Sequence, residues 1–407
     1  MRLLQPLRIK AVALLWAGLS ASAVGDQLGI VAITWIAVGS LGAAAGYLTA
    51  LQAGLTLVTA LLIGRWTDGR NERRLMIAAD AVRALALVVA VAVCTVTGRV
   101  PPMALIGVIV ALAMGEAVPS VQAIMPVLSP SPALLPSING LLDATNRLAR
   151  LCGPGLIALA AARVPVVHFL TLDAVSFLIS AGAVIAIGSR ATQSRRPEGP
   201  VARMLTRGFS AMMRQRLLRY LLQTSALNNG AWYAAMFLGV PLLLAARGGG
   251  VAAFGTVIAC YGVTNLAANL VVGSRPPLAR PGRLILLGIL TSGAGMALMG
   301  VSAAVAGAPG WGLYAGAMIA GAGGPMNDIP RMSLMQAALP QGDVAAAFRA
   351  WMVASASGIL LAMLIAPTLF AAAGPAWGVA LLGSAIVVGG IAGFAARVDT
   401  PVQVAVA

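Results

Sequence analysis

Asp26, Glu116 and Asp328 are acidic residues that stand inside long apolar segments of this 407-residue chain. Asp26 lies about 15 residues into the apolar run that begins at residue 11, or roughly 22 Å along a helix, near the middle of a tilted membrane span. Glu116 lies at a similar depth in a second run, and Asp328 lies in a third. A charge at the centre of a bilayer is costly, and removal from water favours the neutral form of a carboxylate. Asp26, Glu116 and Asp328 are therefore candidates to take up and release protons.

The alternative for each acid is a permanent ion pair. Asp328 and Arg331 are three residues apart, so they can pair on one face of a helix. Other arginines within apolar segments could serve the remaining acids in the same way, namely Arg83, Arg147 and Arg349.

A polar stripe follows one helical face in the segment 136–162. Its members recur at i, i+4, i+7, i+8 and i+11: Asn139, Asp143, Asn146, Arg147 and Arg150. Such a stripe predicts contact with water or a polar ligand, and Arg147 and Arg150 suit an anionic one. The equal alternative is an Asp143–Arg147 pair within a charge network that closes the helix bundle.

A second candidate binding face lies in the segment 217–246. Asn229, Trp232, Tyr233 and Phe237 share one side of a helix, with Asn228 adjacent. These aromatic rings lie well inside the span. They therefore indicate a binding wall that stacks on a ring-bearing ligand, and not an aromatic belt at the membrane interface.

These residues must be positioned by membrane-spanning helices. Hydrophobic residues make up 60% of the chain and charged residues 9%, against about 25% charged in soluble domains. The apolar runs are continuous and about twenty residues long, which indicates helices rather than a barrel of alternating strands. Twelve spans are predicted: 11–38, 43–63, 75–97, 102–125, 136–162, 165–188, 217–246, 251–273, 284–306, 310–337, 344–371 and 375–396.

The basic residues predict the orientation of these spans. Nineteen of the 27 fall at the termini or in connections on the same side, and three (Arg99, Arg163 and Arg247) fall on the other side. This bias predicts that both termini are cytoplasmic. Basic residues spread over short connectors suit contacts with acidic lipids and not nucleic-acid binding.

Several kinds of chemistry find little support in the residues. Lys10 is the only lysine, so no GxxxxGK[ST] phosphate-binding loop is present. Cys94, Cys152 and Cys260 lie singly in apolar segments and His168 is the only histidine, so neither metal nor cofactor binding is expected. We therefore do not expect an enzyme.

The chain is predicted to form two six-helix halves, 1–188 and 217–407, joined by the basic connector 189–216. A shift of 210 residues brings Arg65, Arg70 and Arg73 onto Arg275, Arg280 and Arg283. Because each half has six spans, the two copies have the same orientation in the membrane and form a parallel repeat. A transport pathway is expected at the interface of two such halves.

The segment 64–74 carries a family resemblance. Gly64, Asp68, Arg73 and Arg74 match the major facilitator signature G-x-L-x-D-R-x-G-R-R/K, whereas Trp66, Gly69, Asn71 and Glu72 depart from it. Further segments resemble the branch of bacterial enterobactin-type siderophore exporters and macrolide efflux proteins: Gly25-Asp26, Trp35, Asp80 to Arg83, Asn139-Gly140, and Arg150 with Gly153-Pro154. Gly153-Pro154 also resembles the antiporter motif of drug/proton exchangers.

The resemblance implies the major facilitator fold and a gating role for Gly64, Asp68, Arg73, Arg74, Gly153 and Pro154. It implies that Asp26, Glu116 and Asp328 face a central cavity, and that Asp173, in a peripheral helix, is structural. The function implied is proton-coupled export of a small amphiphilic or chelating molecule, either a siderophore or a drug, by a monomer with protons and membrane lipids as its other partners. A membrane-embedded enzyme or a sensor is the rival from a different class.

Overall fold

The computed structural model describes residues 6–67, 72–116, 134–188, 201–275, 280–305 and 310–398. Within these ranges all regular structure is helical. Of the residues singled out above, Asp68, Gly69, Arg70 and Asn71 lie outside the described part, and of Gly64 only the helical backbone is described. The side chains of Arg65, Trp66, Glu72, Glu116, Asn139 and Asp143 also lie outside it.

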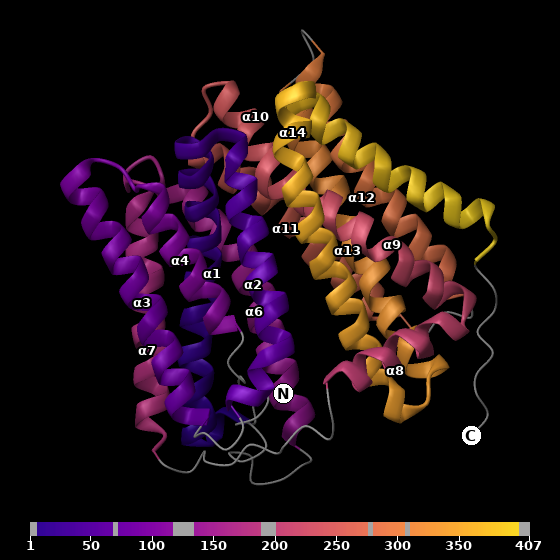
Figure 1. Cartoon of the computed structure of the whole chain (residues 1–407), viewed down its shortest axis with the longest axis horizontal. Helices are drawn as coiled ribbons and strands as arrows, with labels where there is room; N and C mark the ends of the chain where they lie inside the picture. Colours follow the sequence, from indigo (N-terminus) through magenta and orange to yellow (C-terminus); the bar gives the residue numbers. More distant parts are fainter. Residues whose placement is uncertain are drawn as a thin grey trace. The chain divides into compact units, whose positions relative to one another are not determined.

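The first half of the chain forms long helices that agree with the predicted spans. In order along the chain these are α1 (Lys10–Leu41), the 3₁₀ turn η2 (Gly42–Ala44), α2 (Ala45–Thr67), α3 (Glu72–Thr97), α4 (Pro102–Glu116), α6 (Leu135–Ala160) and α7 (Val167–Ala186). Figure 1 shows α1, α3, α4 and α7 running alongside one another.

The second half begins with a helix that the sequence did not predict. α8 (Val201–Arg214) lies within the basic connector. The remaining elements are α9 (Arg216–Ala234), the π-helical turn η4 (Ala235–Gly239), α10 (Val240–Ala246), α11 (Val251–Gly273), α12 (Pro281–Ala304), α13 (Trp311–Ala338) and α14 (Gln341–Ala395).

Seven helical stretches of the described chain are long and apolar enough to cross a membrane. Two of them, Lys10–Thr59 and Gly342–Ala395, have 50 and 54 residues. At 1.5 Å per residue they are about 75–80 Å long, more than twice the ~30 Å hydrocarbon core of a bilayer. Each contains a break, at η2 in the first and at Gly374 (φ 75°) in the second, so each holds two spans.

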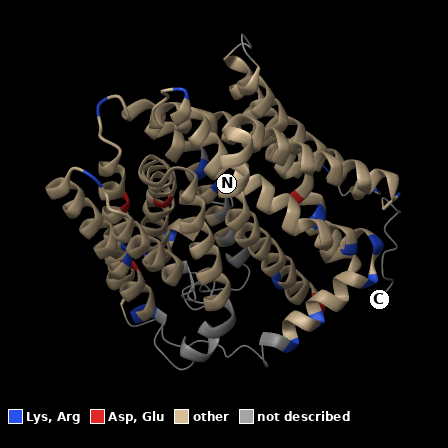
Figure 2. Ribbon diagram, turned by 45° about the horizontal axis from the view of Figure 1, so that its top comes forward, with Lys and Arg blue, Asp and Glu red and all other residues tan. Residues whose placement is uncertain are grey.

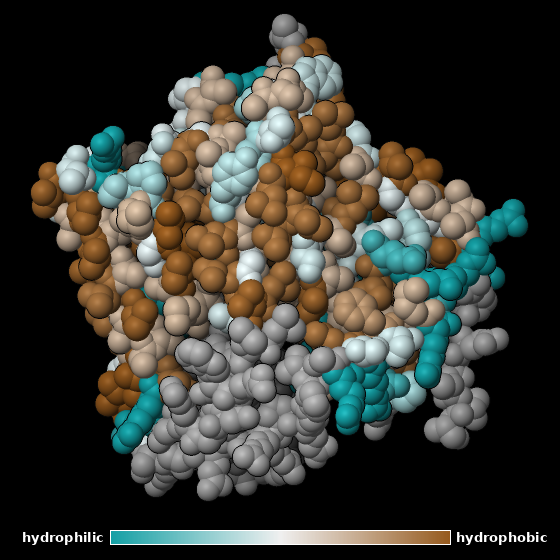
Figure 3. Space-filling view, viewed as in Figure 1, coloured by the Kyte–Doolittle hydropathy of each residue, from teal (hydrophilic) through white to brown (hydrophobic). Residues whose placement is uncertain are grey.

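Lipid-facing surfaces agree with this arrangement. On α3 the exposed residues Val82, Leu85, Val89 and Val96 recur at helical spacing along one face. Figure 3 shows apolar side chains over much of the visible helical surface. In Figure 2 most basic residues lie near helix ends or in the segments between helices. The chain is therefore a multi-pass membrane protein.

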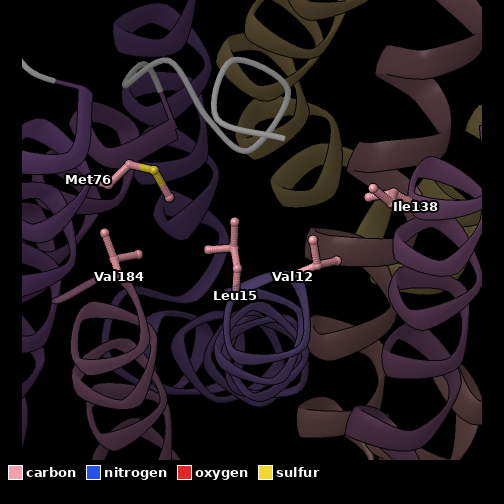
Figure 4. Packing of buried hydrophobic residues seen from close by; sticks show 5 residues of the cluster. All are labelled: Val12, Leu15, Met76, Ile138 and Val184. Atoms are coloured by element: carbon pink, nitrogen blue, oxygen red, sulfur yellow. The ribbon is translucent and has the colours of Figure 1, made fainter. Parts of the chain in front are cut away.

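The chain divides into two compact units. Unit 1 comprises residues 1–42, 55–198 and 251–255, and unit 2 comprises residues 43–54, 199–250 and 256–407. At one end of unit 1, five buried residues from α1, α3, α6 and α7 form an apolar cluster (Figure 4): Val12, Leu15, Met76, Ile138 and Val184.

Glycines on α12 organise unit 2. Gly288 and Gly295 are seven residues apart and face the backbone of α13, whereas Gly293 and Gly300 have the same spacing and face α14. At each position an added methyl group would meet neighbouring backbone at less than 3 Å. Two glycine faces on one helix therefore let three helices approach closely, which is how helices associate in lipid.

Candidate substrate and proton sites

Asp26 lies half-buried near the middle of α1, beside a glycine groove. The flanking Gly25 and Gly29 pack directly on α7, where they face Asp173. Asp173 is 1% exposed, and its carboxylate lies in electrostatic range of Asp26 and of Arg83. An acid that the sequence analysis treated as structural thus adjoins the candidate proton carrier.

A buried ion pair lies on the neighbouring α3. Arg83 bonds to Asp80 one helical turn away, and Ser180 of α7 also hydrogen-bonds to Asp80. The Arg83 guanidinium lies 4.2 Å from the centre of the Phe177 ring, and within the described part of the chain its Nε has no hydrogen-bond partner. Gly115 of α4 leaves room for this side chain, because a methyl group there would lie 2.6 Å from Arg83 Nε. The direct ion-pair partner of Arg83 in the described structure is therefore Asp80.

The polar stripe of α6 is described only at its later positions. Arg147 is half-buried and makes a polar contact, whereas Arg150 is exposed. Thr145 lies between Asn139 and Arg147 along α6, and its Oγ1 accepts a hydrogen bond of 3.0 Å from Trp16 Nε1 of α1. The stripe therefore lies on a helix that packs against α1.

The described gating-motif residues contact neighbouring helices of unit 1. Arg73 donates hydrogen bonds to the carbonyl oxygens of Val184 (3.1 Å) and Ile185 (2.9 Å), so it caps the C-terminus of α7. Arg74 is exposed, and Pro154 lies inside α6. Gly153 packs against Gln27, the residue after Asp26, so closely that a methyl group would overlap its Cβ. The antiporter-like motif therefore adjoins the candidate proton carrier.

The aromatic face of α9 forms a cluster in unit 2. Ring centroids of Trp232 lie 6.0 Å from Tyr233, 5.7 Å from Phe237 and 5.8 Å from Tyr261 of α11, and Tyr233 lies 4.7 Å from Phe237. Tyr261 was missed because nothing in the sequence relates α11 to α9. The π-helical turn η4 follows Tyr233 and contains Phe237, and π-turns occur often at functional sites.

Some polar side chains of α9 have hydrogen-bond partners in the described structure and others do not. Asn229 Nδ2 donates to Ser225 O (2.9 Å) and to Ser355 Oγ of α14 (3.3 Å), so this amide contributes to helix packing. Trp232 Nε1 and Asn228 Oδ1, one turn apart, are buried without a hydrogen-bond partner among the residues that the structure describes. Unsatisfied buried polar atoms are uncommon and call for an explanation such as a ligand.

Asp328 forms an ion pair in unit 2. Its carboxylate lies 2.9 Å from Arg331, whose side chain is 8% exposed. The Arg331 guanidinium also stacks 3.8 Å from the ring centre of Trp351 on α14. This geometry corresponds to the paired alternative for Asp328. In the described part of the chain, no group of three or more His, Cys, Asp or Glu residues could hold a metal ion.

Comparison with known proteins identifies the fold. No sequence-family model matches the chain, and no curated protein sequence matches it. Many solved structures are similar to the chain, and three of them illustrate the match over nearly their whole length. A POT family transporter in complex with a thioalcohol-conjugated peptide has a TM-score of 0.70 at 13% identity, covering 96% of this chain and 97% of that one.

The other two structures are also membrane transporters. The nucleoside transporter NupG has a TM-score of 0.71 at 11% identity, covering 95% of this chain and 99% of that one. A bacterial homologue of the iron transporter ferroportin, in an inward-facing state, has a TM-score of 0.68 at 13% identity, covering 96% and 99%. The chain therefore has the major facilitator fold. The three solved structures compared with it are all membrane transporters and not enzymes.

Proposed function

We propose that this protein is a proton-coupled secondary exporter in a bacterial inner membrane, with both termini in the cytoplasm. Its proposed substrate is a small amphiphilic or chelating molecule, in the first place a siderophore. The alternative is a multidrug or macrolide antiporter. The major facilitator fold and the membrane spans support a transporter, and the resemblance of residues 10–190 to siderophore and macrolide exporters supports the direction of transport.

The aromatic cluster of unit 2 is the observation that carries the substrate class. Three rings from α9, η4 and α11 lie within 6.0 Å of the Trp232 ring, whose indole N–H has no hydrogen-bond partner among the described residues. The carbonyl oxygen of Asn228, one turn away, also has none there. Rings stack on planar ligands, while an unpaired donor and acceptor gain most from a polar substituent on that ligand. A catecholate, which combines a ring with hydroxyl groups, satisfies both.

Charged groups of unit 1 distinguish the two substrate classes. Arg147 and the exposed Arg150 favour an anionic ligand such as a catecholate or carboxylate siderophore. Asp26 and Glu116 would favour a cationic drug if they bound substrate directly. We assign these two acids, with Asp328 as a third candidate, to proton coupling instead, which leaves the arginines to the substrate.

Trp232→Ala tests the substrate site. In liposomes that hold the purified protein under an imposed pH gradient, uptake of a radiolabelled catecholate siderophore should lose about 2- to 12-fold in apparent affinity, from about 0.5–1.5 kcal/mol of ring stacking. Trp377→Ala is the matched control, because Trp377 is 52% exposed on α14. Unchanged affinity in Trp232→Ala, or uptake of a macrolide but no siderophore, would contradict the siderophore assignment.

A further inference from the structure

Asp173 is a carboxylate enclosed by helix backbone inside unit 1. It is 1% exposed on α7 and faces the groove made by Gly25 and Gly29 of α1. A methyl group on Gly25 would lie 2.9 Å from Asp173 Oδ1, and one on Gly29 would overlap Oδ2. The two glycines therefore create the space that this carboxylate occupies.

Few groups are available to stabilise a negative charge there. Ser176 Oγ is the described side-chain donor to Asp173 Oδ1, at 3.4 Å, and it makes a shorter contact of 2.7 Å with the main-chain oxygen of Asp173. The nearby cation, Arg83, is bonded to Asp80. A carboxylate removed from water needs a cation or several donors, and otherwise it takes up a proton.

The helices packed against α7 add charges of both signs. α1 contributes Asp26, and α3 contributes Asp80 and Arg83. Among the described charges that act on Asp173, Arg83 is the cation, whereas Asp26 adds a second negative charge when both acids are ionised. Two neighbouring carboxylates avoid this repulsion by sharing a proton.

We propose that Asp173 is a second proton-carrying residue, which shares the coupling proton with Asp26 across the α1–α7 contact. The glycine groove holds the neutral carboxyl, and a small separation of α1 from α7 would admit water through which the proton leaves. No covalent bond other than O–H changes. This inference deepens the proposed function, because it rests on transport being coupled to protons.

Infrared difference spectroscopy of the purified protein during a pH titration detects the proton itself. Wild type should show the C=O band of a buried protonated carboxyl, and Asp173→Asn should lose it. Asp343→Asn is the control, since Asp343 pairs with Arg207 outside the core of unit 1 and should leave the band intact. Persistence of the band in Asp173→Asn would overturn the proposal.

A second variant tests the proposal even if Asp173→Asn does not fold. Asp26→Asn removes the neighbouring charge but leaves the glycine groove, so the Asp173 band should remain and the pH of its midpoint should shift. A band with an unchanged midpoint would show that the two acids do not share a proton, and would contradict the inference.

Transport assays separate this inference from the function on which it rests. In liposomes, Asp173→Asn should lose at least ten-fold in pH-gradient-driven uptake of a catecholate siderophore while keeping substrate exchange without a gradient. Coupled uptake equal to wild type would refute the role of Asp173 alone. If wild type shows the Asp173 band but the gradient drives no uptake, the proposed function fails while the proton site stands.

Discussion

At the scale of single residues, Arg331 shows how a cation is accommodated in an apolar helix. Its guanidinium has Trp351 on one face and Asp328 at its edge, so burial is compensated by stacking and by one ion pair. A double-mutant cycle of Arg331→Met and Trp351→Leu should give a coupling energy of about 1 kcal/mol in the free energy of unfolding, measured by detergent titration. The cycle of Arg331→Met with the exposed Trp377→Leu should be additive, and equal coupling in both cycles would contradict a specific stack.

Residue types and their depth in the spans were enough to single out Asp26, Trp232 and the possible Asp328–Arg331 pair. Sequence reasoning did not place Asp173 beside Asp26, because that contact depends on the glycines of another helix. Tyr261 was missed for the same reason, since its contact with Trp232 joins α11 to α9. Contacts within one helix follow from periodicity, whereas contacts between helices depend on packing that a single sequence does not reveal.

At the scale of elements, α1 carries a glycine face whose function can be tested by adding one methyl group. Gly29→Ala should lower the free energy of unfolding by about 1–3 kcal/mol, because the new Cβ overlaps Asp173. Gly39→Ala on the same helix meets nothing within 4 Å and should be neutral or slightly stabilising. Detergent titration of both variants checks this, and equal stabilities would show that α1 and α7 can separate without cost.

Hydropathy predicted the described helices closely, including the break between the last two spans, which the structure places at Gly374. Two elements escaped prediction. α8 lies in a polar connector, where it is held by packing of Gly208 on α14 and by the Arg207–Asp343 pair. The π-turn η4 lies within a continuous apolar run, in which Gly239 packs against Phe370 and Val379 of α14. Both depend on tertiary contacts that override local preference.

At the scale of the whole molecule, the distribution of arginine predicts how the protein sits in the membrane. Nineteen basic residues lie on the side assigned to the cytoplasm and three on the other. Each basic residue resists translocation, so this asymmetry should fix the orientation of all spans together. The connector 189–216 and the ends near Arg99 and Arg247 are the segments that distinguish the two possible orientations.

Cysteine labelling tests this orientation. In a variant without Cys94, Cys152 and Cys260, single cysteines in the connector should resist a membrane-impermeant maleimide in intact cells and react after permeabilisation. Single cysteines beside Arg99 and Arg247 should react in intact cells, because they are predicted to face outward. Reaction of the connector from outside would reverse the topology.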